Sequence, residues 1–206
     1  MISRMDADVG RLMKLLKQLN LDEKTLVIFT SDNEPHQECG HKHEFFDSNG
    51  DLTGYKRSMH EGGIRVPMIA RWPGKIAAGT VSDHPSGFYD FLPTACELAG
   101  VEPPQDIDGI SYLPALLGRK DQQEKHEYLY CASQEGATSV GVRYGKWKLV
   151  RYRSANGGKR KQQVAGNLEW RLYNLAEDIG EKNDLAGKHL EVVQKILSLL
   201  NRDALL

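Results

Sequence analysis

The stretch TLVIFTSDN, residues 25–33, decides the fold. Its first six residues form a continuous apolar run that is rich in β-formers, which suits a strand covered on both faces, as in a parallel sheet. Just before it, apolar residues recur at helical spacing from Met5 to Leu19 and predict a surface helix with one buried stripe. A helix followed by a buried strand is typical of an α/β fold.

Two residues with side-chain oxygens, Asp32 and Asn33, follow this strand directly. In open α/β sheets, ligands bind beyond the carboxyl ends of the strands. A carboxylate and an amide oxygen are hard ligands for a divalent cation, but calcium takes roughly six to eight oxygens, so this pair could supply only part of a shell. The same residue types also favour helix caps and Asx turns, so these residues alone leave both interpretations open.

A second group of residues lies in the long stretch from Ser31 to Gly63, which is rich in Gly, His, Asp and Asn. Long irregular segments in compact domains are usually functional or disordered. Within it, Lys56 is a compact point charge that suits an anionic group, although taken alone it reads as a surface lysine. The paired glycines 62 and 63 permit a tight backbone path. Arg65 could brace this loop by pairing with Glu61 or with a backbone carbonyl.

The remaining chain predicts further elements of the α/β domain and then, after about residue 120, a second, smaller domain. A short strand over 64–70 is interrupted by Pro67, which suggests a strand start or an edge. Helices are expected over 88–99, with Gly100 as the C-terminal stop, and over 111–117. After about residue 120 come four short strand-like runs and a final helix, typical of a small α+β domain. These runs are 127–131, 139–143, 147–152 and 171–175, and the final helix covers 190–200.

Composition excludes several classes of protein. The 206 residues are 40% hydrophobic and 27% charged, and the formal net charge is −1. No overall field would attract nucleic acid or an acidic membrane surface. No stretch approaches the roughly 18 apolar residues that span a bilayer. Three cysteines argue against a disulfide scaffold.

The two groups of residues belong to a longer ordered set of motifs. In chain order these are MDADVGR (5–11), SDN (31–33), GYK (54–56), EGGIRVP (61–67), MIARWPGKI (68–76), DFLPT (90–94), DG with Ser111 and Leu113 (108–113), GKWKL (145–149) and LYNL (172–175). Together they closely resemble the sulfatase family, which has the alkaline-phosphatase-like fold. The resemblance covers essentially the whole chain, and the ordered set is far more specific than any single motif.

This resemblance implies both a fold and a set of roles. Residues 1–120 would be the C-terminal part of a parallel-sheet α/β catalytic domain, and residues 121–206 a small α+β domain with a short antiparallel sheet and a C-terminal helix. Asp32 and Asn33 would be ligands of a calcium ion, or of magnesium. Lys56 would contact the oxygens of the sulfate ester, and the substrate would be an aryl or a carbohydrate sulfate.

Histidines supply a weaker set of candidates. Some sulfatases carry a histidine soon after Ser-Asp-Asn, and His36 fits that place as a general acid for the leaving alkoxide. His41, His43 and His60 are further candidates, and each also fits the description of an ordinary polar loop residue. Glu34 departs from the resemblance, because the family usually has Gly after the Asn. Its carboxylate would be either another ligand or a change in the loop.

One expected segment is missing from the 206 residues. The sulfatase family has a Cys/Ser-X-Pro-X-Arg segment whose Cys or Ser becomes the nucleophilic formylglycine, and no such segment occurs here; none of the three cysteines, which include Cys39, fits it. The paired aspartates that complete the cation shell in the family also have no match. We therefore expect a chain that is inactive alone. Its partner would be a separate N-terminal half or, through an exposed sheet edge, a second copy.

Two alternatives and the compartment stay open at this point. A phosphatase, phosphodiesterase or phosphonate hydrolase of the same fold would commonly use Asp-His with two softer metals, whereas Asn33 favours one hard ion. A non-catalytic remnant or binding module would keep the motifs without turnover. Met1 is followed at once by a helix with no signal segment, so either the protein is cytoplasmic or the chain begins within a longer one, and the motifs favour the latter. Sulfatases are often periplasmic, secreted or lysosomal.

Overall fold

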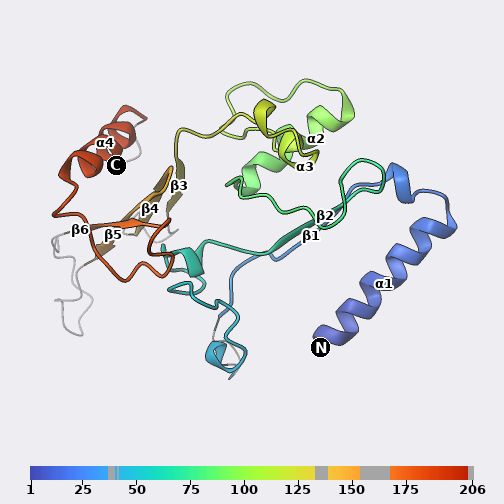
Figure 1. Ribbon diagram of the computed structural model, residues 1–206, viewed down its shortest axis with the longest axis horizontal. Helices are drawn as coiled ribbons and strands as arrows, with labels where there is room; N and C mark the ends of the chain where they lie inside the picture. Colours follow the sequence, from blue (N-terminus) through green and yellow to red (C-terminus); the bar gives the residue numbers. More distant parts are fainter. Residues whose placement is uncertain (37–39, 41, 133–138, 154–167, 204–206) are drawn as a thin grey trace. The chain divides into compact units, whose positions relative to one another are not determined.

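The computed structural model describes residues 1–36, 40, 42–132, 139–153 and 168–203. It consists of two compact units, each built from two separate segments of the chain (Figure 1). Unit 1 comprises Met1–Ser31 and Pro67–His126, and unit 2 comprises Asp32–Val66 and Glu127–Leu206. The chain therefore passes between the units three times. The domain boundary that we predict after residue 120 stays a prediction.

Unit 1 contains the first helix, a strand pair and two further helices. Their bounds are α1 (Ile2–Gln18), β1 (Val27–Thr30), β2 (Met68–Arg71), α2 (Phe91–Ala99) and α3 (Leu113–Leu116). The predicted helices are confirmed, and α2 ends at Gly100, whose φ of 67° is the left-handed conformation that glycine adopts at helix ends. Strand β2 begins directly after Pro67, as a proline at a strand start predicts.

The strand pair of unit 1 differs from the sequence prediction. Strands β1 and β2 pair antiparallel, with Val27 opposite Arg71 and Thr30 opposite Met68. The parallel pairing that we predict for the strand at 25–30 is therefore not found among the described strands, and the second half of β1 is exposed rather than covered. An apolar run predicts only that a strand can be buried. The direction of pairing depends on the connection between the two strands, which here is residues 31–67.

The buried stripe predicted for α1 is likewise absent, although every residue of this helix is described. None of its residues is buried. In the predicted stripe Met5, Leu12 and Leu19 are exposed, and Val9 and Leu16 are half-buried. Their spacing is that of an amphipathic helix, so the sequence correctly predicts the helix and its apolar side. It does not predict what covers that side, because the covering surface must come from another element.

A buried aspartate organises the second half of unit 1. The carboxylate of Asp90, which is fully buried, accepts hydrogen bonds from the backbone amides of Gly87 and Ile110 at 2.7 and 2.8 Å. Nε2 of His126 lies 2.8 Å from the same carboxylate. Buried carboxylates are tolerated when they are paired and hydrogen-bonded in this way. The DFLPT motif at 90–94 thus joins the start of α2 to two distant loops.

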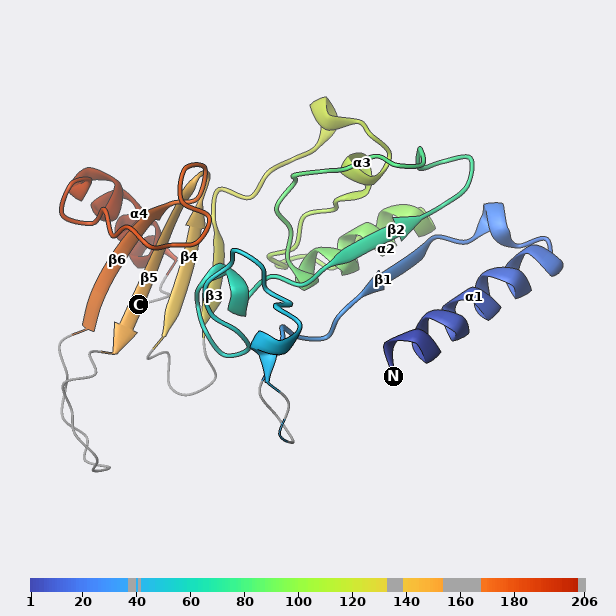
Figure 2. The same cartoon turned by 60° about the horizontal axis from the view of Figure 1, so that its bottom comes forward.

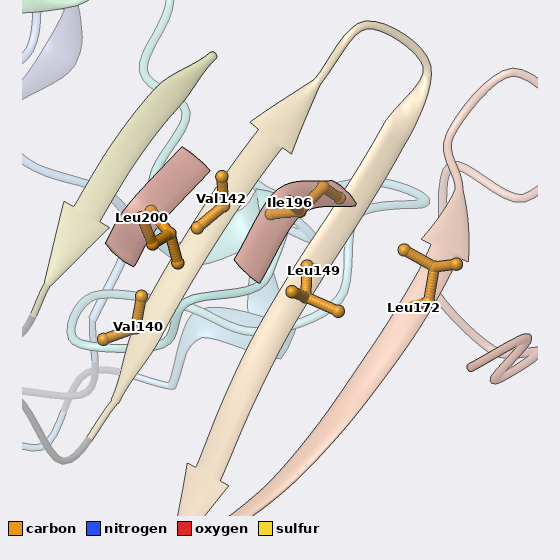
Figure 3. Close-up of a cluster of buried hydrophobic side chains, with 6 residues drawn as sticks. All are labelled: Val140, Val142, Leu149, Leu172, Ile196 and Leu200. Atoms are coloured by element: carbon orange, nitrogen blue, oxygen red, sulfur yellow. The ribbon is translucent and has the colours of Figure 1, made fainter. Parts of the chain in front are cut away.

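Unit 2 is a four-stranded antiparallel sheet with one helix on it (Figure 2). The strands follow chain order, β3 (Leu129–Ala132), β4 (Val140–Tyr144), β5 (Trp147–Arg153) and β6 (Leu168–Asn174), and the helix is α4 (Leu190–Arg202). This confirms the predicted antiparallel sheet and C-terminal helix. Figure 3 shows the apolar core on the helix-covered face, formed by buried side chains of Val140, Val142, Leu149, Leu172, Ile196 and Leu200.

The opposite face of this sheet is covered by the segment from Thr53 to Ile64, which we call the covering loop. Alternate residues of a strand point to opposite faces, so Val150 lies on the other side from Leu149. It packs with Met59 of the covering loop and with Tyr173 of β6. Gly141 allows the close approach, because a Cβ atom there would lie 3.1 Å from the Met59 carbonyl oxygen.

Candidate functional site

All four residues that the sequence nominates for the site, Asp32, Asn33, His36 and Lys56, lie in unit 2. They occupy two loop segments that are joined through the backbone. The amide of Lys56 donates a hydrogen bond of 3.0 Å to the carbonyl of Pro35. The two groups of residues identified in the sequence are therefore neighbours in space as well as in the motif order.

The acid–amide pair presents oxygen atoms that fit a hard cation. Asp32 is exposed and Asn33 is half-buried. Nδ2 of Asn33 donates to the Glu34 carbonyl at 2.8 Å, which turns Oδ1, the atom that would bind a cation, to the other side of the amide group. Among the described residues, no group of three or more His, Cys, Asp or Glu side chains could hold a metal ion. The calcium site that the residue types suggest therefore stays a prediction.

Glu34 adds a second carboxylate to this neighbourhood. Its side chain is half-buried, and burial raises its pKa above the ordinary value of a glutamate, while the nearby charge of Lys56 acts in the opposite direction. The opposite charges of Glu34 and Lys56 therefore interact.

The candidate histidines have different surroundings. The ring of His36 lies 5.9 Å from the ring of Tyr55, centroid to centroid, and its Nδ1 is buried. His60 is 14% exposed at its side chain, and its Nδ1 lies 3.3 Å from the Glu181 carboxylate. His43 opens a short 3-10 turn over His43–Phe45.

The structure brings His36 next to the Lys56 segment, since Tyr55 precedes that lysine. His60 is held by Glu181 against the sheet, where its ring also lies 5.8 Å from that of Tyr173. His60 is thus a loop residue whose side chain is largely buried beside Glu181, and a part in the site stays a prediction for it. His41 and Cys39 lie outside the described residues.

The covering loop is a tight structure that depends on its paired glycines. The amide of Gly62 donates to the Thr53 carbonyl at 2.8 Å, which closes the loop around Lys56. A Cβ atom on Gly62 would lie 2.5 Å from the Gly54 carbonyl oxygen and 2.7 Å from that of Thr53, so no larger residue fits without movement of the backbone. The tight backbone path predicted for glycines 62 and 63 is confirmed.

A buried ion pair lies beneath this loop. Nζ of Lys148, on β5, is 2.9 Å from Oε1 of Glu61, and the two side chains are 0% and 1% exposed. Arg65 and Arg143 approach the other carboxylate oxygen to 3.5 and 3.9 Å. The pairing of Arg65 with Glu61, one of the two alternatives considered, is confirmed.

Lys148 was not identified from the sequence as a partner of Glu61. The available signal was a charged residue that alternates with Leu149 and shares its face with the apolar Val150. A lysine at such a position must find a buried anion, but the sequence does not say which one.

Comparison with known proteins assigns the chain to a family. A family model described as Sulfatase matches residues 1–101. Mouse steryl-sulfatase is 41% identical over 219 residues, covering 95% of this chain and 35% of that protein. The chain belongs to the sulfatase family. Dog N-acetylgalactosamine-6-sulfatase is 37% identical over 98% of the chain and 42% of its own length.

Solved structures agree with this assignment. The crystal structure of Ps i-CgsB in complex with k-i-k-neocarrahexaose matches 98% of this chain and 41% of its own chain, at 28% identity and a TM-score of 0.76. The α/β fold class predicted for the chain is thereby confirmed. The chain spans 35% of the length of the mouse relative and 42% of the length of the dog relative. No helix among the described residues is long and apolar enough to cross a membrane.

Proposed function

We propose that the whole protein hydrolyses sulfate esters and that this chain supplies the sulfate-contacting lysine and part of the cation shell. Membership of the sulfatase family supports the reaction class. The single observation that carries the assignment of residues is the hydrogen bond of 3.0 Å between the Lys56 amide and the Pro35 carbonyl. It brings the lysine segment against the residues that directly follow Asp32 and Asn33.

Each residue has a chemical role in this proposal. Asp32 and Asn33 hold a calcium or magnesium ion, which when bound polarises a sulfate oxygen as a Lewis acid. Lys56 binds the sulfate oxygens and neutralises charge that develops on them; one well-placed group of this kind lowers a barrier by about 3 kcal/mol. His36 gives a proton to the leaving oxygen.

The substrate that we propose is a sulfated carbohydrate. Two relatives support this class: the dog enzyme, which is an N-acetylgalactosamine-6-sulfatase, and the solved protein that binds k-i-k-neocarrahexaose. The mouse relative is a steryl-sulfatase, so a steryl or aryl sulfate is the competing substrate. Competition between N-acetylgalactosamine 6-sulfate and a steryl sulfate for the chain would decide between them.

The nucleophile is a separate part of the proposal. The 206 residues contain no Cys/Ser-X-Pro-X-Arg segment. We propose that this chain by itself binds sulfate but does not turn it over, and that a matched N-terminal half carrying formylglycine restores calcium-dependent release of sulfate. If the chain mixed with the N-terminal half binds sulfate but hydrolyses no sulfate ester, the result would favour a non-catalytic binding module.

Association through unit 1 follows from its strand pair. Strands β1 and β2 pair only with each other among the described strands, so each has one outer edge that is a template for further pairing. We propose that these edges bind the matched N-terminal half, or a second copy when that half is absent. Light scattering that finds a monomer at high concentration, with no binding of the N-terminal half, would contradict this.

The binding experiment uses the purified chain. Calorimetric titration with sodium sulfate in the presence of calcium should show binding that is weakened at least about tenfold in Lys56→Ala, a change of about 1.4 kcal/mol. Lys195→Ala is the matched control, because Lys195 is an exposed lysine on α4. Asp32→Asn should weaken the calcium dependence alone. Equal sulfate affinity in the Lys56 and Lys195 variants would overturn the assignment of Lys56, and stronger binding of phosphate than of sulfate would favour a phosphatase.

A further inference from the structure

The ion pair between Lys148 and Glu61 is unusual in its burial and in what it joins. Both side chains are fully enclosed, and the two residues lie 87 positions apart in the sequence. Apolar contact between the sheet and the covering loop already exists through Met59, Val150 and Tyr173. An ion pair is therefore not needed simply to hold the two surfaces together.

Stability alone gives a weak reason for such a pair. Replacing a buried ion pair with apolar residues of similar volume is often neutral or stabilising, because desolvation of two charges offsets their attraction. A charge-assisted hydrogen bond does differ from an apolar contact in one respect, since it is directional. At 2.9 Å it fixes the Glu61 carboxylate relative to β5.

Glu61 is connected to Lys56 by a short series of backbone contacts. Its own amide donates to the Glu181 carboxylate at 2.6 Å, a second buried anchor. The next residue, Gly62, donates to the Thr53 carbonyl, which lies three positions before Lys56. Glu61 is therefore linked through Gly62 to Thr53, at the start of the covering loop.

The other end of the loop is also held. Thr53 donates through Oγ1 to the Gly180 carbonyl at 2.5 Å, next to the residue that anchors Glu61. The covering loop also contacts the segment that follows Asp32 and Asn33, through the hydrogen bond from the Lys56 amide to the Pro35 carbonyl. Three directional contacts, with Lys148, Glu181 and Gly180, thus anchor the covering loop that carries Lys56.

We propose that Lys148 is a positioning residue of the sulfate site: through its ion pair with Glu61 it holds the covering loop so that Lys56 lies against the segment of Asp32 and Asn33. The role of Lys56 rests on the proposed function, whereas the mechanical link from Lys148 to Lys56 does not. Lys148, the second lysine of the GKWKL motif, thus acts on the site through Glu61 and without contact with the ligand.

The experiment separates position from stability by removing both charges together. The double variant Lys148→Met/Glu61→Met keeps the volume of the pair and leaves no charge buried alone. Hydrogen exchange of the Lys56 and Gly62 amides reports the position of the loop, because both are hydrogen-bonded in the structure. The matched control is Arg71→Met/Asp22→Met, which removes an ion pair of 2.7 Å from unit 1.

We expect the two amides to exchange at least about tenfold faster in the Lys148 double variant, a local opening less costly by about 1.4 kcal/mol. The amides of β4 and β5 should exchange as before, and sulfate affinity should fall as far as in Lys56→Ala. The control double variant should change neither. Unaltered exchange of the Lys56 amide in a folded double variant would overturn the proposal.

A second variant keeps the test decisive if the double variant does not fold. Glu61→Gln keeps the shape of the side chain and an oxygen for Lys148, and removes only the charge. We expect the Lys56 amide to exchange faster than in the wild type, by less than about tenfold. An unchanged exchange rate would overturn the proposal. Absence of sulfate binding in the wild type would reject the proposed function alone. In that case the exchange measurements still decide the role of Lys148.

Discussion

The two faces of the sheet in unit 2 are built from the same strands but use different chemistry. One face is covered by α4 through apolar side chains, among them Leu149 and Leu200. The other face combines a small apolar contact around Val150 with the enclosed pair of Lys148 and Glu61. Apolar contacts are non-directional and tolerate repacking, whereas paired charges depend on geometry. The helix face therefore stabilises the sheet, and the loop face also determines the position of a segment.

The largest effect should come from breaking the charge pair on one side only. Lys148→Met leaves Glu61 buried without its main partner, which typically costs 3–5 kcal/mol, so we expect a loss of about 4 kcal/mol in the free energy of unfolding. Urea denaturation followed by circular dichroism would measure it. A loss below about 1 kcal/mol would mean that Arg65 and Arg143 compensate for the missing lysine.

A cavity on the helix face should cost slightly less and act differently. Leu149→Ala removes a side chain that is fully buried against α4, which we expect to cost about 3 kcal/mol. Because Leu149 faces away from the covering loop, exchange of the Lys56 amide should follow only global unfolding. Faster local exchange at Lys56 in this variant would show that the two faces are not independent.

A smaller effect is expected where the loop touches the sheet. Gly141→Ala places a Cβ atom 3.1 Å from the Met59 carbonyl oxygen and 3.3 Å from its Cβ, so the loop must move by a few tenths of an ångström. We expect a loss of about 1–2 kcal/mol from this overpacking, together with faster exchange at Lys56. The same substitution at Gly145, where a Cβ atom would meet nothing within 4 Å but φ is 57°, is a control for backbone strain without contact with the loop.

The smallest expected effect concerns pH at the edge of the site. Burial raises the pKa of Glu34, so the folded state binds this proton more tightly than the unfolded state, whose value is near 4.5. Stability should therefore fall as the pH rises from about 4.5 through the folded pKa, and Glu34→Gln should remove this part of the loss. Urea denaturation at pH 4.5 and 7 would measure the difference, and identical pH dependence in both proteins would contradict it.

Local patterns predicted most elements of the fold. Helical spacing located α1 and α4, Gly100 marked the end of α2, and the four strand-like runs became β3 to β6. The antiparallel pairing of β1 with β2 and the lack of buried residues on α1 were not predicted. Both depend on which elements meet, and a single-strand or single-helix pattern carries no information on its neighbours.

The site was predictable to the extent that its residues lie in short motifs. Asp32, Asn33 and Lys56 were identified from two such motifs, and their segments do meet. The anchors of the covering loop were not identified, because Lys148 and Glu181 lie 87 and 120 residues from the groups that they bind. Their role is visible only when the sheet is assembled, since nothing in the sequence near either residue names its partner.

The division of unit 2 into two chain segments has a consequence for its synthesis. The covering loop leaves the ribosome well before residues 127–206, which contain the whole sheet that it covers. Until β5 has been made, the Glu61 carboxylate stays solvated and the covering loop has no sheet to pack against. Because such long-range contacts are slow to form, we expect the site to be among the last parts to mature, and a truncation before Lys148 to leave these motifs unstructured.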